Sequence, residues 1–247
     1  LTNSGMVIFF NFAHPEKLPL PIYSHMDNSP KETSSSCMQF LKHRALISFT
    51  EAGIIICFNL MIINNIEIFS IPGASAVITA LTLSGIQINN SKFIDNVATA
   101  SGGAIRADAS TNSIKIYNSQ FIDNVANEYA GGISIGTNSE VHNCTFKGNN
   151  VTSTANNRGT GGALNVRSEG FVTISDCSFE DNFASQKGGA VVCGGANIKN
   201  SNFTSNSVGT ESVTGSGGAV YIMNKNGLSL TVSDSRFDDN KLINKNG

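Results

Sequence analysis

Four aspartates recur at one position of a repeated segment, and they are the side chains best placed to do chemistry. Each stands directly before an asparagine, and the four are Asp95, Asp123, Asp181 and Asp239. Carboxylates gathered on one face could hold a cation or act as acid and base on a polysaccharide. Asp95 and Asp123 are the adjacent pair that could share a cation such as Ca²⁺. Gly148 and Ser205 interrupt the row.

An Asp-Asn turn, bonded to its own backbone, also explains these aspartates. The sequence favours the turn. We therefore expect no catalytic residue and no metal ligand. Asp95 and Asp123 are the candidate ligands if a cation does bind. We also expect no cofactor, because the Gly-Gly pairs lack the Lys-Ser/Thr that a phosphate-binding loop needs.

Two of the five cysteines could react with each other. Cys144 and Cys177 occupy the same repeat position in neighbouring copies, where the other copies have serine. They are either buried thiols in place of serine or a disulfide, and stacking would bring their Cα atoms within bonding range. Both interpretations stay open.

Sequons offer a modification site, whereas histidine offers little. Asn-x-Ser/Thr occurs at Asn89, Asn143, Asn150 and Asn202, of which Asn150 and Asn202 are expected to be exposed. In a eukaryotic secretory route, Asn150 would be the preferred glycosylation site, because it begins a long polar stretch. His142 stands alone beside Asn143, and chance sequons are common in an Asn-rich chain.

A short motif occurs six times between Ile88 and Asn240 and must position these residues. Each copy has small polar residues, a Phe, and an Asn three places later. The phenylalanines are Phe93, Phe121, Phe146, Phe179, Phe203 and Phe237; the asparagines are Asn96, Asn124, Asn149, Asn182, Asn206 and Asn240. Gly-Gly and apolar residues separate the copies, at 102–103, 131–132, 161–162, 188–189 and 217–218.

The spacing of this motif predicts a parallel β-helix. Successive Phe residues are 28, 25, 33, 24 and 34 positions apart, the range of solenoid repeats. Segments such as 113–117, 171–175 and 228–232 alternate with period two, which indicates strands. Coils about 4.8 Å apart would stack the Phe rings inside and the Asn amides into a ladder. Each Gly pair would allow a tight corner with positive φ.

Gly-Gly-Ala-Ile with Phe-x-x-Asn resembles the repeat of the polymorphic outer membrane proteins, surface adhesins and autotransporters of chlamydiae. The resemblance covers about residues 86–240. It implies a right-handed, pectate-lyase-like β-helix of about six to eight coils, displayed on the cell surface and linked to adhesion. Transfer of the fold is safer than transfer of the cellular role.

Two regions flank or interrupt the regular copies. Residues 1–50, with four prolines between 14 and 30, are expected to be an irregular segment or cap, and 51–247 the β-helix. The apolar stretch 51–72 favours one or two degenerate coils, with residues 63–68 echoing residues 86–90, over a membrane span. Residues 73–90 are expected to form a coil without its Phe. Long polar gaps at 150–160 and 207–216 predict loops on one edge, either a binding face or surface drift.

Composition limits the functions to be considered. A net charge of −2 and 14% charged residues argue against nucleic-acid binding. We expect a non-enzymatic extracellular or cell-surface solenoid that acts in adhesion or assembly through its flank and loops. Its expected partners are other protein chains or cell-surface glycans. The alternatives are a polysaccharide-degrading enzyme and a structural subunit of a larger filament or surface assembly. We also expect self-association or further coils beyond residue 247.

Overall fold

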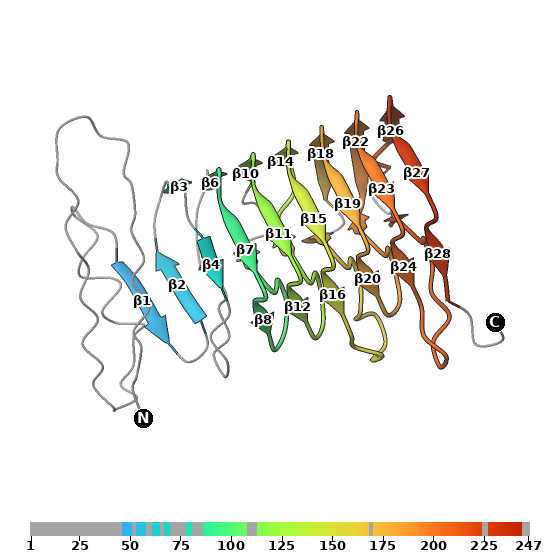
Figure 1. The fold of residues 1–247 in the computed structure, drawn as a ribbon, viewed down its shortest axis with the longest axis horizontal. Helices are drawn as coiled ribbons and strands as arrows, with labels where there is room; N and C mark the ends of the chain where they lie inside the picture. Colours follow the sequence, from blue (N-terminus) through green and yellow to red (C-terminus); the bar gives the residue numbers. More distant parts are fainter. Residues whose placement is uncertain are drawn as a thin grey trace.

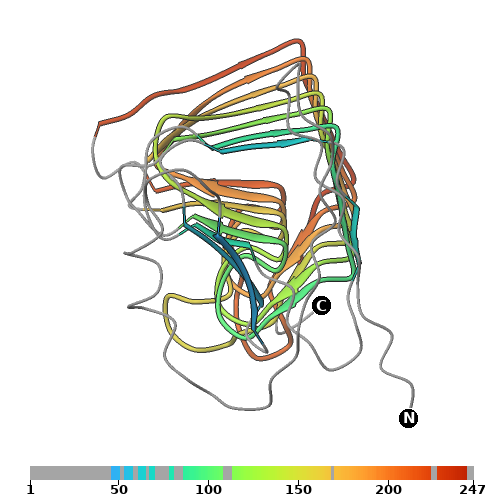
Figure 2. The same ribbon diagram turned by 90° about the vertical axis from the view of Figure 1, so that its left-hand side faces the viewer.

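The computed structural model describes residues 86–107, 113–167, 170–223 and 227–243, and the backbone of five strands between 46 and 80. The described residues form strands and turns, arranged in four sheets that run along one axis (Figure 1). Viewed along that axis, successive coils lie over one another (Figure 2). The predicted all-β parallel helix is confirmed.

The strands of each sheet are as follows. Sheet A contains β1 Leu46–Thr50, β2 Gly53–Cys57, β5 Ile78–Ala80, β9 Ile105–Ala107, β13 Ile133–Ile135, β17 Leu164–Val166, β21 Val191–Cys193 and β25 Val220–Ile222. Sheet B contains β3 Met61–Asn64, β6 Ile86–Asn89, β10 Ile114–Tyr117, β14 Ser139–His142, β18 Phe171–Ser175, β22 Gly195–Lys199 and β26 Leu230–Ser233.

Sheets C and D complete each coil. Sheet C contains β4 Glu67–Phe69, β7 Lys92–Ile94, β11 Gln120–Ile122, β15 Thr145–Lys147, β19 Ser178–Glu180, β23 Asn202–Thr204 and β27 Arg236–Asp238. Sheet D contains β8 Val97–Ala98, β12 Val125–Ala126, β16 Asn150–Val151, β20 Phe183–Ala184, β24 Ser207–Val208 and β28 Lys241–Leu242. The chain visits A, B, C and D in turn, so the described strands make seven coils, beginning at β2.

Strand β1 is the exception to the parallel order. It pairs antiparallel with β2, with Leu46 opposite Cys57, and lies at the end of sheet A. Residues 46–50 are therefore a strand, although they fall in the segment predicted to be irregular. The rest of that segment, 1–45, lies outside the described residues.

The apolar stretch 51–72 contributes strands β2, β3 and β4. Ile63 pairs with Ile88 and Asn64 with Asn89, so this stretch stacks on the segment whose sequence it resembles. Ile68 pairs with Phe93, so this first coil has Ile at the position that Phe occupies in the later coils. The prediction for residues 73–90 was wrong, because the coil that begins at β5 continues into β7 and contains Phe93. No helix in the described part of the chain is long and apolar enough to cross a membrane.

Apolar side chains from the inward positions of all four sheets fill the coil. Burial alternates along the strands, as in β10, where Ile114 and Ile116 are buried and Lys115 is exposed. In sheet D the second residue of the strands β8 to β24, such as Ala126 or Val151, points inward. This period-two burial follows from the pleat of a strand. The inward residues of sheets A, B and C make one continuous core, and Ala98, Ala126 and Val151 of sheet D form a second, smaller cluster.

Three columns of left-handed residues turn the chain at the corners. The B–C corner has Asn90, Asn118, Asn143, Asp176, Asn200 and Asp234, and the C–D corner has Asp95, Asp123, Gly148, Asp181, Ser205 and Asp239, all with φ between 46° and 65°. The corner before sheet A has Gly102, Ala130, Gly161, Gly188 and Gly217. Asn, Asp and Gly tolerate this conformation better than other residues.

The glycine that follows each left-handed residue at the corner before sheet A serves a different purpose. A Cβ on Gly162 would lie 2.1 Å from the Gly189 carbonyl oxygen and 2.6 Å from that of Phe183 in sheet D. The connection into sheet A therefore packs backbone against backbone, and only glycine fits there.

Candidate functional site

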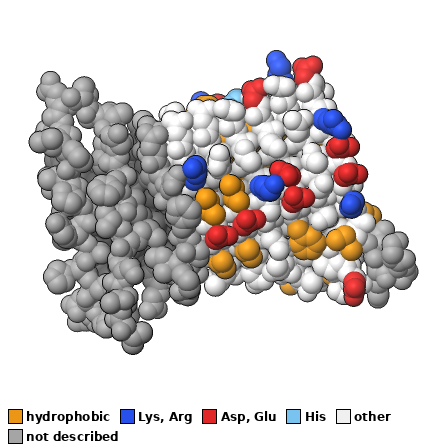
Figure 3. All heavy atoms as spheres, in the orientation of Figure 1, with side chains coloured by type: hydrophobic (Ala, Val, Ile, Leu, Met, Phe, Trp, Pro, Cys, Tyr) orange, Lys and Arg blue, Asp and Glu red, His pale blue; other side chains and the backbone are white. Residues whose placement is uncertain are grey.

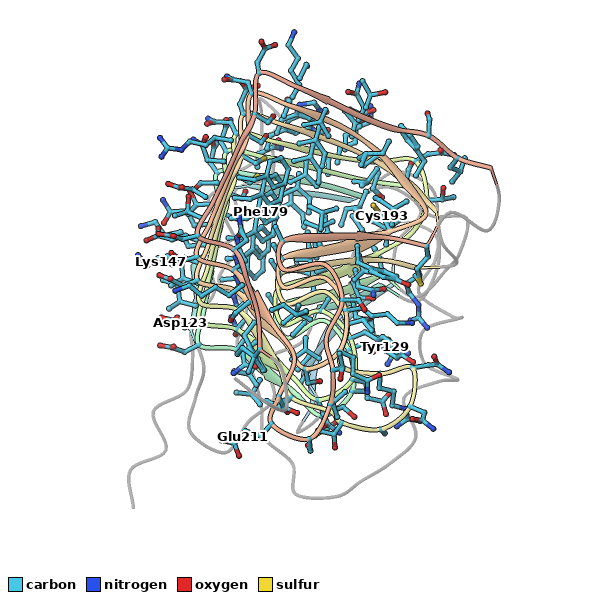
Figure 4. All side chains as sticks on the ribbon, turned by 90° about the vertical axis from the view of Figure 1, so that its right-hand side faces the viewer. Asp123, Tyr129, Lys147, Phe179, Cys193 and Glu211 are labelled. Atoms are coloured by element: carbon cyan, nitrogen blue, oxygen red, sulfur yellow. The ribbon has the colours of Figure 1, made fainter. Side chains whose placement is uncertain are left out.

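The structure brings the six predicted phenylalanines into one column inside the coil. Neighbouring ring centroids are 4.6–5.0 Å apart and the planes are within 8° of parallel. The first five rings are fully buried, whereas Phe237 is 45% exposed at the end of the column. Figure 4 shows Phe179 inside the coil. Stacked, buried rings contribute both apolar burial and ring–ring attraction.

The six asparagines form a buried amide ladder beside the rings. Asn149 Nδ2 donates to Asn182 Oδ1 (2.9 Å) and to the Phe121 carbonyl (2.9 Å). Its Oδ1 accepts from the Nδ2 (2.9 Å) and backbone N (3.2 Å) of Asn124. The same Asn-to-Asn bonds connect Asn96, Asn124, Asn149, Asn182, Asn206 and Asn240. Because a buried polar group is costly when unpaired, this ladder fixes the register of the coils.

A second buried column contains serines and the two predicted cysteines. Ser119 Oγ donates to the carbonyl two residues earlier (2.8 Å), as do Ser91, Ser201 and Ser235. The Sγ atoms of Cys144 and Cys177 occupy the same place and contact the His142 and Ser175 carbonyls, each at 3.1 Å. Cys144, Cys177 and Cys193 are free thiols in the structure.

The surroundings of these thiols change their acidity. A hydrogen bond with Cys144, together with burial, raises the pKa of the Cys177 thiol. The same bond, given by Cys177, lowers the pKa of Cys144. Burial raises the pKa of Cys193, which lies inside the coil (Figure 4), to about 12. A thiol that stays protonated at neutral pH is a poor nucleophile, so Cys193 acts as an apolar core residue.

The four predicted aspartates lie at exposed turn positions of the C–D corner. Their φ angles are 51–55°, and Gly148 and Ser205 take the same conformation in the other coils. Asp123 leans over Gly148, since a Cβ there would lie 2.0 Å from its Oδ1. Within the described residues, no group of three His, Cys, Asp or Glu side chains could hold a metal ion. The arrangement is that of a repeated turn.

The four sequons differ from expectation in one respect. Asn150 is the first residue of β16, not part of a loop, and its Oδ1 is buried without a hydrogen-bond partner. Asn202 is exposed on sheet C, and Asn143 is exposed at the B–C corner. Asn89 is half-buried in β6. Among the two preferred sequons, Asn202 is thus the more accessible.

His142 belongs to a polar network on the outer face of sheet B, which the sequence did not reveal. Its ring stacks on Tyr117 at 5.3 Å, and its Nδ1 lies 2.5 Å from Ser175 Oγ. Its Nε2 is 3.7 Å from Glu140, which also binds Lys115 (3.0 Å). A hydrogen bond from Lys115 lowers the pKa of Glu140, and the same bond raises the pKa of Lys115. The prediction that His142 stands alone was wrong.

Both long gaps become loops at the same corner, as predicted. The corner between sheets D and A is spanned by two residues after β12 and β20, but by 152–159 after β16 and 209–215 after β24. Both loops project from the lower edge in Figure 1, and Glu211 of the second loop lies at that edge in Figure 4. Arg158 pairs with Glu128 of the preceding corner, and Gln186 of the next corner bonds the Ala155 carbonyl. The first loop is therefore tied to both neighbouring corners.

Comparisons with known proteins agree with the predicted resemblance. Residues 176–194 match the model of the Chlamydia polymorphic membrane protein repeat. That segment runs from the B–C corner at Asp176 through Phe179, Asn182 and the Gly188-Gly189 pair into β21. No curated protein sequence and no solved structure matches the chain. The repeat and the β-solenoid fit a cell-surface protein.

Proposed function

We propose that this protein is a non-enzymatic surface solenoid that acts in adhesion or assembly through its flanks and its two loops. One observation carries the proposal: uninterrupted buried columns of rings and amides hold successive coils in fixed register. Outward side chains on such a body keep constant positions, so they can contact another molecule over several coils at little entropic cost. The loops add two protrusions to one edge.

The loops can be tested by shortening them to the natural length. Residues 152–159 and 209–215 are each replaced by Ser-Gln, the dipeptide that spans this corner after β20. Beads that carry the 247-residue protein are offered to cultured epithelial cells and to a glycan array. We expect the unaltered protein to bind and the double-shortened variant to bind at least several-fold less.

A variant with Lys115→Met serves as the control, because Lys115 lies on sheet B, away from the loop corner. A cooperative thermal transition in every variant would show that all of them are folded. If neither the unaltered protein nor the variants bind any cell or glycan, the adhesion role is wrong. If shortening the loops leaves binding unchanged, the flanks and not the loops make the adhesive contacts.

A further inference from the structure

Two apolar pairs enclose two carboxylates on the flank where sheet C meets sheet D. Ile94 ends β7 and pairs with Ile122, which ends β11; Val97 begins β8 and pairs with Val125, which begins β12. Asp95 and Asp123 occupy the corner between these pairs. We call these residues the apolar–acidic strip: Ile94, Ile122, Asp95, Asp123, Val97 and Val125.

The strip is open to solvent. Val97 is 44% exposed, the other three apolar side chains are half-buried, and both aspartates are exposed. Figure 3 shows apolar side chains on both sides of the carboxylates on this face. Single exposed apolar residues are ordinary, but adjacent ones around a polar centre are typical of interaction sites.

Both rows of apolar residues are interrupted in the coil that follows β11 and β12. In the next coil, Lys147 takes the place of Ile122 and Asn150 that of Val125. The strip is therefore a local feature, although the turn beneath it recurs in every coil.

Within the part of the chain that the structure describes, no ion pair neutralises Asp95 or Asp123. Lys147 of the same flank is paired with Glu180 at 2.8 Å, although its charge also interacts with that of Asp123. Lys92 lies on the far side of Ile94 along β7. Neighbouring strands are about 4.8 Å apart, so the backbones of Asp95 and Asp123 are close enough for one guanidinium group, with its fork of N–H donors, to reach both carboxylates.

We propose that the apolar–acidic strip binds a protein surface that presents an arginine or lysine among apolar side chains. The cation would lie between Asp95 and Asp123, and its apolar neighbours would pack on Ile94, Ile122, Val97 and Val125. Partly desolvated charge contacts surrounded by apolar contacts are typical of interface centres. This inference rests on the proposed function, because it names the part of the flank that meets a partner and the chemistry of that partner.

Methyl NMR of the 247-residue protein tests the strip with two peptides. One is Gly-Val-Leu-Arg-Leu-Val-Gly, and in the other Glu replaces Arg. We expect the Arg peptide to shift the methyl signals of Ile94, Ile122, Val97 and Val125, with weaker binding as NaCl screens the charges. The Glu peptide should leave them in place. Equal shifts with both peptides, no shifts, or shifts confined to other methyls would overturn the proposal.

Charge variants supply the matched control. Asp95→Asn with Asp123→Asn should weaken binding of the Arg peptide about tenfold. Asp181→Asn with Asp239→Asn removes two carboxylates from the same turn position outside the strip, and should change the affinity less than twofold. An equal loss of affinity in both double variants would show that only the net charge of the protein matters, and would overturn the proposal.

Two further outcomes would also overturn it. Methyl shifts caused by CaCl₂ alone would assign the strip to a cation, and shifts caused by raising the protein concentration would assign it to a second copy of the chain. The proposed function is tested separately. If the protein adheres equally well with Asp95→Asn and Asp123→Asn and binds no peptide, only the proposal for the strip is wrong. If it binds the peptide but does not adhere, only the proposed function is wrong.

Discussion

Asn149 shows how much of this fold depends on one side chain. Its amide makes four hydrogen bonds, to two neighbouring coils, and it is fully buried. The spacing of Phe and Asn in the sequence predicts this ladder, because a residue repeated once per coil must stack on itself. The bonds to the Phe carbonyls could not be predicted, since they depend on how far each amide reaches across the coil.

Replacing Asn149 with alanine should destabilise the protein by about 3 kcal/mol. The change removes the acceptor of the Asn124 backbone N–H, the donor to the Phe121 carbonyl, and one of the two hydrogen bonds donated by Asn124 Nδ2. Urea denaturation followed by circular dichroism measures the loss. Asn197→Ala, at an exposed position of β22, should cost less than 0.5 kcal/mol. Similar losses for both variants would contradict a structural role for the ladder.

Ala130 occupies a corner position that glycine holds in the other coils. The sequence aligns Gly131-Gly132 with the other Gly pairs, but the backbone hydrogen bonds place Gly132 beside Ala104 and Ala163. Gly131 is therefore the close-packed glycine, and Ala130, at φ 52°, takes the left-handed position. The motif alone could not reveal this shift, because the apolar residue Ile133, and not the Gly pair, sets the register.

Ala130→Gly should stabilise the protein by about 0.5 kcal/mol. Relief of the left-handed alanine contributes about 1–2 kcal/mol, and the greater freedom of glycine in the unfolded chain offsets part of it. The reverse change at the equivalent position, Gly161→Ala, should be destabilising, because its Cβ would lie 2.4 Å from the Leu164 carbonyl oxygen. Thermal melts of both variants would give shifts of opposite sign, and shifts of the same sign would contradict this assignment.

Sheet B shows what sequence reasoning misses at the scale of an element. Glu140 is 25 positions from Lys115 and 23 from Tyr117, and His142 and Ser175 are 33 apart. They meet because outward positions of successive strands pair in register. Aligning the repeats strand by strand would have placed these side chains next to one another. The connections between the repeated motifs vary in length, so the sequence does not show that alignment directly.

Lys115→Met should raise the pKa of Glu140 toward its ordinary value of 4.5, because Lys115 is the main cause of its depression. A depressed carboxyl pKa gives stability that is present above the unfolded value and lost as pH falls through the folded value. The variant should therefore differ from the parent above about pH 4.5 and converge with it in more acidic solution. Carboxyl NMR titration and melting temperatures across pH 3–7 measure both effects.

Lys199→Met is the comparison for that titration, since Lys199 lies on the same sheet in a later coil. It should leave the Glu140 titration unchanged. An unchanged Glu140 pKa in Lys115→Met would show that the ion pair on this face has no effect on the carboxyl.

For the whole molecule, the sequence predicted the architecture better than the role. Landmarks that recur in every coil fix the parallel stacking and the interior columns, because a solenoid repeats its own contacts. The coil that contains Ile68 and the strand β1 departed from the pattern, since neither carries the landmarks. The partner could not be predicted, because outward residues vary from coil to coil without affecting the fold.

An assay against polysaccharides tests the hypothesis that the protein is not an enzyme. Incubation with acidic and neutral polysaccharides should produce no new reducing or unsaturated ends. The four aspartates lie at exposed turns, and a hydrolase or lyase needs its carboxylates gathered around one bond. Turnover that Asp95→Asn or Asp123→Asn abolishes would instead establish the enzyme.

The corner between sheets D and A already accepts connections of very different length while the flanking strands stay paired. Val151 stays paired with Ala126 and Ala184, and Thr160 with Tyr129 and Lys187, across an eight-residue connection. Foreign peptides could therefore be grafted between Val151 and Thr160, and again between Val208 and Ser216, without refolding the body. The protein would then be a scaffold that holds two epitopes at a fixed separation of two coils.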